Sequence, residues 1–172
     1  MNKDNIMRKL KIEKVTVNAG VGESSDKLDK AKKVLQKVTG KMPALTKARQ
    51  RVQVFGIKKG ETIGVKVTLR GKEAEDLLRK AFDAIDQKMS GRAFDEFGNF
   101  AFGIKEYIDF PGMRYDPTLG LIGFDICVTV ARPGFRVAKR KRKRSRLPLS
   151  QRGTKEESIA FVKEKFGVTT VG

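Results

Sequence analysis

The densest chemical feature of this sequence is a run of cations that no acidic residue interrupts. No Asp or Glu occurs between Asp125 and Glu156. Eleven Lys and Arg residues fall inside that gap: Arg132, Arg136, Lys139, Arg140, Lys141, Arg142, Lys143, Arg144, Arg146, Arg152 and Lys155. Cations at this density repel one another and stay solvated unless phosphates neutralise them, and release of the polyanion's counterions then favours binding. The run therefore predicts a contact with a polyanion.

The positive charge extends beyond that run. The 172-residue chain has 38 Lys and Arg against 20 Asp and Glu, a formal net charge of +18 and a pI near 10.2. Residues 1–125 alone hold 25 Lys and Arg against 17 Asp and Glu, an excess of +8. A solvated tail is the common alternative for a charge run, but an excess spread over the whole chain favours nucleic acid as the partner.

Two segments resemble parts of enzymes but have simpler interpretations. The segment 18–23, NAGVGE, begins like a dinucleotide-binding fingerprint, yet Ser25 stands where the third glycine is needed. Asp95, Glu96 and Asp109 could form a general acid–base pair, but they lie in a turn-rich region where carboxylates usually form turns or stay solvated. Neither segment predicts catalysis.

The cysteine and histidine content points the same way. Cys127 lies in an apolar segment, and the chain has no histidine to activate it, so we expect a thiol in the core. A single cysteine forms no internal disulfide, and the commonest metal ligand and general base is missing. We therefore expect no metal, no cofactor and no enzymatic activity.

Length and hydropathy limit the organisation of the chain. Its length fits a single domain, 1–172, and we expect a basic loop at 132–153 inserted before a C-terminal helix. The first residues lack the apolar core of a signal peptide, and no run of about twenty apolar residues occurs. The expectation is a cytoplasmic protein that does not span a membrane.

Alternation of apolar and polar residues predicts the strands. Strands are expected over 12–19, 102–110 and 124–130, each with one apolar side. The polar sides of the first and last of these carry Lys14, Thr16, Asn18, Asp125, Cys127 and Thr129. A hairpin is expected over 51–70, with Val52 and Val54 on the ascending strand and a turn at Lys59-Gly60. Its return strand alternates Val65, Val67 and Leu69 with Lys66, Thr68 and Arg70.

Three helices are expected from apolar residues at helical spacing. The first covers 26–38 and ends at Gly40, and the second covers 72–89 with Leu78, Phe82, Ile85 and Met89 on one stripe. Thr154 and Glu157 form a capping-box pattern that opens the last helix.

These elements predict an α+β fold, in which helices pack on one face of an antiparallel sheet of four to five strands. The other face is then open, and its hydroxyl, amide and cationic groups suit the backbone and sugars of a nucleic acid. Thr16, Asn18, Thr68 and Thr129 are placed to meet phosphate oxygens or 2′-hydroxyls. The alternative is a face that is merely solvated.

The aromatic residues divide into two groups. Phe94, Phe97, Phe100, Phe102 and Phe110 follow the strand alternation and are expected mainly in the core, with base stacking as the alternative. Phe55 differs, because it lies beside Lys58 and Lys59 at the expected hairpin tip, where an apolar ring gains little from folding. We interpret this tip as a second contact site.

A series of motifs in order resembles the universal large-subunit ribosomal protein five family. The motifs are KVTVNAGVGES (14–24), TGKMPALTKAR (39–49), FGIKKGETIGVKVTLRG (55–71), FDEFGNFAFGIKEYIDFPGMRYDP (94–117) and GLIGFDICVTVARPG (120–134). The RPGFRVAKRKRKR stretch and the closing TKEESIAFVKEKFG are similar to the archaeal and eukaryotic branch.

The resemblance implies a ribosomal protein that binds 5S rRNA and attaches it to the central protuberance of the large subunit. It also implies contacts with large-subunit rRNA, with the peptidyl-site tRNA and with neighbouring ribosomal proteins. The family's 5S rRNA contacts correspond here to Asn18, Lys41, Thr68 and Asp125, and Lys41 stands where many bacterial members carry an amide. The tRNA-facing hairpin corresponds to Phe55–Thr62.

Pattern and resemblance together give three expected groups of contact residues. For 5S rRNA they are Lys14, Thr16, Asn18, Lys41, Lys47, Arg49, Lys66, Thr68, Arg70 and Asp125. For tRNA they are Phe55, Gly56, Ile57, Lys58, Lys59, Gly60, Glu61 and Thr62. For other rRNA they are Arg132, Arg136, Lys139, Arg140, Lys141, Arg142, Lys143, Arg144 and Arg146. The rival function is a DNA-binding or chromatin-like protein, although the chain has no recognisable helix-turn-helix, zinc-finger or basic-zipper pattern.

Overall fold

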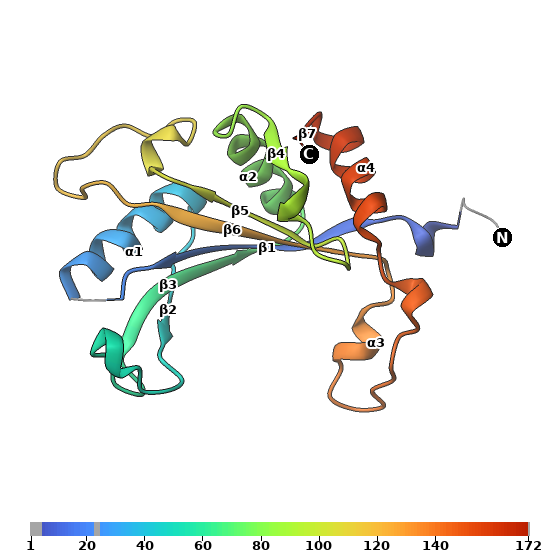
Figure 1. The fold of residues 1–172 in the computed structure, drawn as a ribbon, viewed down its shortest axis with the longest axis horizontal. Helices are drawn as coiled ribbons and strands as arrows, with labels where there is room; N and C mark the ends of the chain where they lie inside the picture. Colours follow the sequence, from blue (N-terminus) through green and yellow to red (C-terminus); the bar gives the residue numbers. More distant parts are fainter. Residues whose placement is uncertain (1–4, 23–24, 172) are drawn as a thin grey trace.

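The computed structural model describes residues 5–22 and 25–171 of the chain (Figure 1). The strands are β1 (Lys11–Gly20), β2 (Ala44–Lys47), β3 (Thr62–Leu69), β4 (Lys88–Ser90), β5 (Phe100–Ile104), β6 (Phe124–Ala131) and β7 (Thr169–Val171). The α-helices are α1 (Ser25–Thr39), α2 (Lys72–Asp83), α3 (Arg136–Lys139) and α4 (Lys155–Phe166). Short 3-10 helices cover Ile6–Arg8, Gln53–Phe55, Gly91–Ala93, Tyr107–Asp109 and Leu149–Gln151.

Five strands form one antiparallel sheet in the order β2-β3-β1-β6-β5. The first long strand of the sequence is therefore the central one, paired with β3 on one side and β6 on the other. Val15, Val17 and Ala19 are buried on one side of β1, as the alternation predicts. The expected strands 12–19 and 124–130 are confirmed to within a residue or so at each end.

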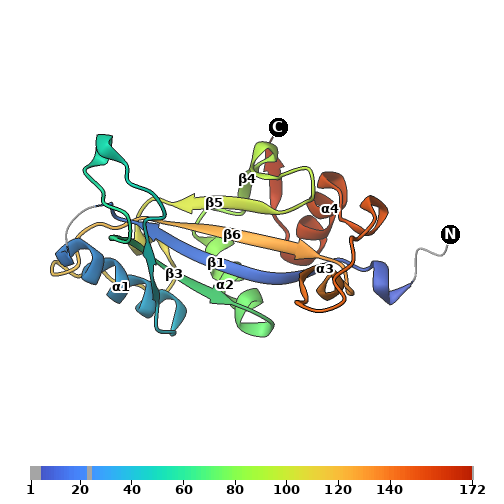
Figure 2. The ribbon, with the colours of Figure 1, turned by 90° about the horizontal axis from the view of Figure 1, so that it is seen from below.

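Helices α1 and α2 cover the apolar face of the sheet, and no helix of comparable length lies on the other side in the described chain (Figures 1 and 2). Leu35 of α1 and Leu78 and Phe82 of α2 are buried against this face. Because one apolar stripe per helix faces one apolar face of the sheet, a single core forms between the two layers. The predicted α+β fold with helices on one face is confirmed.

A second, smaller sheet closes the C-terminal end of the fold. Strand β4 pairs in parallel with β7, so that Lys88 lies opposite Thr169. Helix α4 leads into β7 and begins with the predicted capping box, in which Thr154 and Glu157 bond reciprocally. It ends at Gly167, whose φ of 72° is the left-handed conformation that glycine adopts without strain. Alternation over so few residues does not show in the sequence, and the pattern does not predict this sheet.

The ascending strand of the expected hairpin is misplaced. The strand that precedes β3 in the chain and pairs with its outer edge is β2, at 44–47. Val52 and Val54, which were expected in that strand, lie in an exposed loop. Residue Val52 forms only an isolated bridge with Ile57. The return strand is correct, since Val65, Val67 and Leu69 are buried in β3.

Two further expected elements end earlier than predicted. The helix expected over 72–89 ends at Asp83, because Asp86 and Gln87 adopt positive φ angles of 53° and 55° and turn the chain. Met89 is buried, but it lies in β4. The strand expected over 102–110 covers 100–104 and is followed by a loop with a 3-10 turn at Tyr107–Asp109.

Candidate nucleic-acid interface

The register of the sheet gathers the predicted polar side chains on its uncovered face. Asn18 of β1 lies opposite Lys66 of β3 on one side and Asp125 of β6 on the other. Two residues earlier on the same face, Thr16 lies opposite Thr68 and Cys127. Cross-strand neighbours are about 5 Å apart, so these groups form a continuous polar surface. We call the surface of Lys14, Thr16, Asn18, Lys66, Thr68, Asp125, Cys127 and Thr129 the open face.

The strands beside this surface add short side chains to it. Ala44 pairs with Lys66 at one edge, and Ala101 and Gly103 pair with Cys127 and Asp125 at the other. Between Gly103 and Asp125 there is little room, because a Cβ at Gly103 would lie 3.1 Å from Asp125 Oδ1. Short side chains on the neighbouring strands let the backbone of a folded polyanion approach the sheet closely.

Cys127 contradicts the expectation of a core thiol. It is exposed on the open face, opposite Thr16 and Ala101. Partial burial raises the pKa of the thiol, and the nearby carboxylate of Asp125 raises it further. The apolar residues next to Cys127 in the sequence lie on the opposite side of β6. The expectation of a buried thiol was wrong because it rested on these neighbours and not on the side of the strand that Cys127 occupies.

A β-bulge at one end of β1 turns an acidic residue toward the basic segment. The register of β1 against β6 shifts between Ile12 and Lys14, which leaves Glu13 as the extra residue. Its carboxylate lies 2.6 Å from Lys139 Nζ of α3 and 3.8 Å from the Arg70 guanidinium after β3. Glu13 is not among the predicted site residues, because no sequence pattern marks a single acidic residue as part of a basic site.

Two segments project from the sheet on the side of the open face, at opposite ends of the strands (Figure 1). One is the tip loop, residues 48–61, between β2 and β3. The other is the basic segment, residues 132–153, which follows β6 and contains α3. A strand of ten residues such as β1 spans roughly 30 Å, which is the scale of the surface between them.

The tip loop presents apolar side chains to solvent. Val54 is 88% exposed and Phe55 is 67% exposed. The turn behind them is ordered, because Gly56 adopts a φ of 66° and Glu61 accepts a 2.7 Å hydrogen bond from the Lys58 amide. Exposed apolar residues on an ordered turn between lysines are typical of a contact surface for a partner. The predicted residues from Phe55 to Glu61 lie in this loop, whereas Thr62 begins β3.

The basic segment contains two cations that serve the fold itself. Arg132 is only 11% exposed and holds both carboxylate oxygens of Glu157 at 2.7 Å. Lys139 pairs with Glu13. The remaining predicted cations are exposed and have no carboxylate partner within residues 5–22 and 25–171: Arg136, Arg140, Lys141, Arg142, Lys143, Arg144 and Arg146. So many unpaired cations on one projection form a strong attractor for phosphates.

Comparison with known proteins identifies the family of this chain. Residues 5–58 match the family model described as ribosomal protein L5, and residues 62–161 match the model of the C-terminus of the same ribosomal family. The large ribosomal subunit protein uL5 of Sulfurisphaera tokodaii is 50% identical over 97% of this chain and 95% of its own length. That of Methanococcus vannielii is 51% identical over 96% and 93%.

The chain belongs to the ribosomal protein L5 family. The resemblance seen in the sequence is thereby confirmed, including its archaeal character, since these relatives are archaeal. Members of the L5 family are structural proteins of the large ribosomal subunit in the cytoplasm, not enzymes, and the expectations about activity and location are confirmed with the family. Strands from both matched segments share one sheet.

Three of the cations predicted to contact 5S rRNA lie away from the centre of the L5-family open face. Lys41 lies in the bend after α1 and pairs with Glu73 at the start of α2. Lys47 ends the edge strand β2 after a register shift, and Arg49 lies in the tip loop. The structure therefore leaves these three residues at the periphery. It brings the other seven of the ten predicted residues together around β1: Lys14, Thr16, Asn18, Lys66, Thr68, Arg70 and Asp125.

Asp95 and Asp109, two of the carboxylates in the enzyme-like pattern, lie in separate turns of this L5-family fold. Asp95 accepts hydrogen bonds from the amides of Phe97 and Asn99 at 2.9 and 2.7 Å, which is an Asx turn. Asp109 lies in a separate 3-10 turn. Within the described ranges, Asp, Glu and Cys side chains form no group of three or more that could hold a metal ion. None of the described helices has the length and hydropathy of a membrane span.

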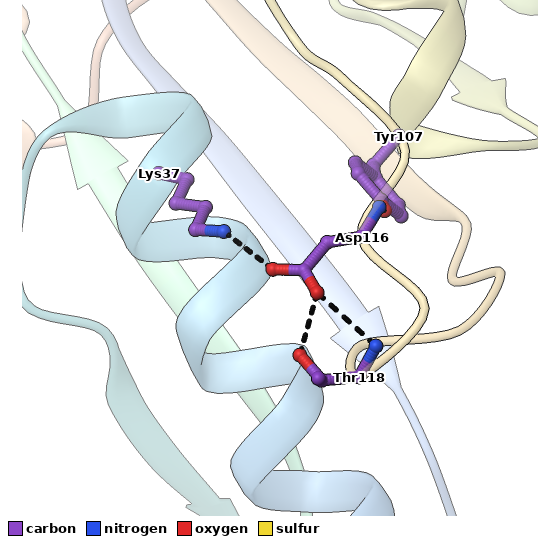
Figure 3. A network of polar contacts seen from close by, with 4 residues as sticks. All are labelled: Lys37, Tyr107, Asp116 and Thr118. Atoms are coloured by element: carbon purple, nitrogen blue, oxygen red, sulfur yellow. Dashed lines mark hydrogen bonds and ion pairs between the residues drawn. The ribbon is translucent and has the colours of Figure 1, made fainter.

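A polar network fixes the long loop between β5 and β6 to the helix layer (Figure 3). Asp116 Oδ2 lies 3.0 Å from Lys37 Nζ of α1, and Oδ1 accepts bonds from the hydroxyl and amide of Thr118. The Thr118 hydroxyl, the Lys37 ammonium and the Thr118 amide lower the pKa of Asp116 from 3.8 to about 2. The buried Tyr107 hydroxyl accepts the Asp116 amide at 2.8 Å. This loop is thereby held away from the open face.

Proposed function

We propose that this chain binds 5S rRNA through the open face and attaches it to the central protuberance of the large subunit. The observation that carries the proposal is the register of β3, β1 and β6, which aligns Thr68, Thr16, Asn18 and Asp125 on one uncovered surface. A merely solvated face needs no such collection of hydroxyl and amide groups between two cationic projections. Hydroxyls and amides recognise phosphates and 2′-hydroxyls, whereas the flanking cations provide long-range attraction.

Asp125 has a distinct role in this proposal. A carboxylate repels phosphate, so Asp125 accepts hydrogen bonds from a base amine, from a 2′-hydroxyl or from a neighbouring cation. Its neighbour across the strands is Asn18, whose amide can donate to the same sugar or base edge. A pair with one acceptor-only group distinguishes a ribose or base from a phosphate.

The two projections serve other partners in the same assembly. The tip loop, with Phe55 and Lys58 exposed, contacts the peptidyl-site tRNA, and the unpaired cations of the basic segment contact large-subunit rRNA. The proposal is supported by their separation along β1, since partners at opposite ends of the strands do not compete for space. Neighbouring ribosomal proteins of the central protuberance meet the remaining surface.

The single cysteine makes this function testable without altering the interface. Cys127 lies in the middle of the open face, and no other residue of the chain reacts as a thiol. We expect saturating 5S rRNA to slow alkylation of Cys127 by N-ethylmaleimide at least about tenfold, measured by intact mass, because only the small unbound fraction reacts. A Cys127→Ser chain with Thr170→Cys on the exposed surface of β7 is the control and should react equally with and without RNA.

Unchanged alkylation of Cys127 at an RNA concentration that saturates binding would show that the RNA lies elsewhere. The same assay separates the rival function, because duplex DNA at physiological salt should neither protect Cys127 nor displace 5S rRNA. Protection by DNA equal to that by 5S rRNA would favour a DNA-binding protein instead.

A further inference from the structure

A pocket of about 230 Å³ lies at the base of the basic segment and adjoins the open face at Thr129. Its walls come from the end of β6, from the turn that carries Phe97, from Phe135 before α3, and from Arg152 at the end of the basic segment. The lining residues thus come from three segments that are separate in the sequence, 97–99, 129–135 and 151–153. Arg152 and Phe97 have no place in the function proposed so far.

The turn on one side of the pocket is held rigidly. Besides the two amide bonds to Asp95, the Asn99 side chain donates to Asp95 at 2.8 Å and accepts from the Val130 amide of β6 at 3.2 Å. Gly98 lies tightly against α4, because a Cβ there would lie 2.0 Å from Ser158 Oγ. Phe97 is thus presented by a fixed turn while remaining 40% exposed. A fixed ring binds a flat partner with little loss of conformational entropy.

The charged groups of the pocket are arranged for a partner outside the chain. The Arg152 guanidinium lies 4.7 Å from the centre of the Phe97 ring, and it makes no ion pair or hydrogen bond within residues 5–22 and 25–171. Glu157 of α4 is already occupied by Arg132 and by the Thr154 amide. A planar cation that rests on an aromatic ring and lacks an anion is a stacking surface for a nucleobase.

A second aromatic ring lines the same pocket. Phe135 is half-buried and carries the Lys139 ammonium at 5.0 Å from its ring centre. Polar groups on the pocket rim, the Gln151 amide and the Thr129 hydroxyl, can donate to and accept from the edge of a base. Planar groups and hydrogen-bonding groups that line one pocket match an unpaired base better than a phosphate, which needs only cations and amides.

We propose that this pocket binds one unpaired nucleobase of the RNA whose phosphates the basic segment holds, between the Phe97-backed guanidinium of Arg152 and the ring of Phe135. The proposal rests on the RNA-binding function proposed above and adds a base-specific site to a segment that otherwise contacts phosphates alone. The basic segment then determines which nucleotide of a single-stranded RNA lies at the pocket, in addition to holding the RNA backbone.

The test uses a fluorophore that the chain lacks. No tryptophan occurs in the sequence, so Phe97→Trp introduces the only indole. A single-stranded adenylate decamer should quench its fluorescence saturably, whereas a decamer of abasic ribose phosphates, with the same charges, should not. Leu121→Trp, at an exposed position in the loop before β6, is the control and should be quenched by neither. Quenching of Phe97→Trp by the abasic decamer to the same extent would overturn the proposal.

A second variant tests the stacking role of Arg152 without placing an indole in the pocket. Arg152→Lys preserves the charge but removes the plane, so we expect it to weaken binding of the adenylate decamer about tenfold and to leave the abasic decamer unaffected. Equal affinity of Arg152→Lys and the parent chain for the adenylate decamer would exclude a stacking role. If 5S rRNA protects Cys127 while both pocket tests fail, only the pocket is wrong, and if Cys127 is unprotected the open-face function fails independently.

Discussion

Asn18 and Asp125 lie directly opposite each other on strands β1 and β6. Their strand neighbours Val17 and Ile126 are buried against the helix layer, so Asn18 and Asp125 belong to the other face of the sheet. An amide and a carboxylate side by side offer a hydrogen-bond donor and an acceptor to the edge of a base or to a ribose, as the proposed function requires. The pair is flanked by Lys66 and by Gly103, so a cation adjoins Asn18 and a residue without a side chain adjoins Asp125. The proposed 5S rRNA contact is therefore built on backbone pairing, and substitution of surface side chains should change affinity without unfolding the chain.

The double variant Asn18→Ala with Thr68→Ala tests this separation of binding from folding. Removal of each hydrogen bond should weaken 5S rRNA binding by roughly 1–3 kcal/mol if the RNA buries it. Filter binding measures the affinity, and circular dichroism checks that the sheet is intact. Thr170→Ala, on exposed β7, is the control and should bind normally. Parental affinity in a correctly folded double variant would count against the open face.

Neutralising the tip loop should separate the two RNA partners. We expect Lys58→Gln with Lys59→Gln to leave 5S rRNA affinity nearly unchanged, because both residues lie in the loop beyond the end of the sheet. The same change should loosen peptidyl-site tRNA on assembled ribosomes, measured as a faster dissociation rate. Lys88→Gln with Lys163→Gln, two exposed lysines outside the loop, is the matched control. An equal loss of 5S rRNA binding would show that the two sites are one.

The unpaired cations of the basic segment should contribute in a salt-dependent and sequence-independent way. A variant with four Gln substitutions should flatten the plot of log affinity against log salt by about 0.7–0.9 for each phosphate that the segment no longer neutralises. The four positions are Lys141, Arg142, Arg144 and Arg146, which leaves Lys139 to hold Glu13. The control carries Gln at four lysines of α1 in the helix layer: Lys27, Lys30, Lys32 and Lys33. Identical slopes for the two variants would contradict a specific role for the segment.

The Asp116 network should make stability depend on pH in the acid range. The folded-state pKa of Asp116, about 2, lies below its ordinary value of 3.8, so its contribution to stability is complete above that ordinary value. As pH falls toward 2 the carboxylate protonates in the folded chain too, and the contribution disappears. Urea unfolding of the parent and Asp116→Asn should therefore differ most near neutral pH and converge as the pH approaches about 2. A difference that stays the same from neutral pH down to that value would show that the charge of Asp116 is irrelevant.

The long strands were predictable because burial on one side imposes strict alternation. From Val15 to Ala19 in β1 and from Phe124 to Val130 in β6 every second residue is apolar, and the register that brings Asn18 to Asp125 follows once the apolar sides face the same helices. The open face was therefore largely predictable. What sequence could not supply was the bulge at Glu13, because an extra residue in a strand leaves no trace in composition.

The misplaced strand has a physical explanation in Val54. β-branched residues favour strands, but Val54 is exposed in a loop, so its type does not reflect burial in this chain. The true partner strand, β2, is a short edge strand with exposed Ala44 and half-exposed Leu45, and it shows no alternation. Sequence patterns report burial within the fold, and they mislead where an apolar residue is exposed in a loop or where a strand lies at an edge.

The central place of β1 has a consequence for how the chain is made. Both neighbours of β1 come later in the sequence, and β6 ends only at Ala131. While synthesis proceeds, the first long strand has two unpaired edges and an uncovered apolar side, the condition in which nascent chains aggregate. A polypeptide that stops before Phe124 cannot complete the sheet, so truncated products should be insoluble rather than partly active.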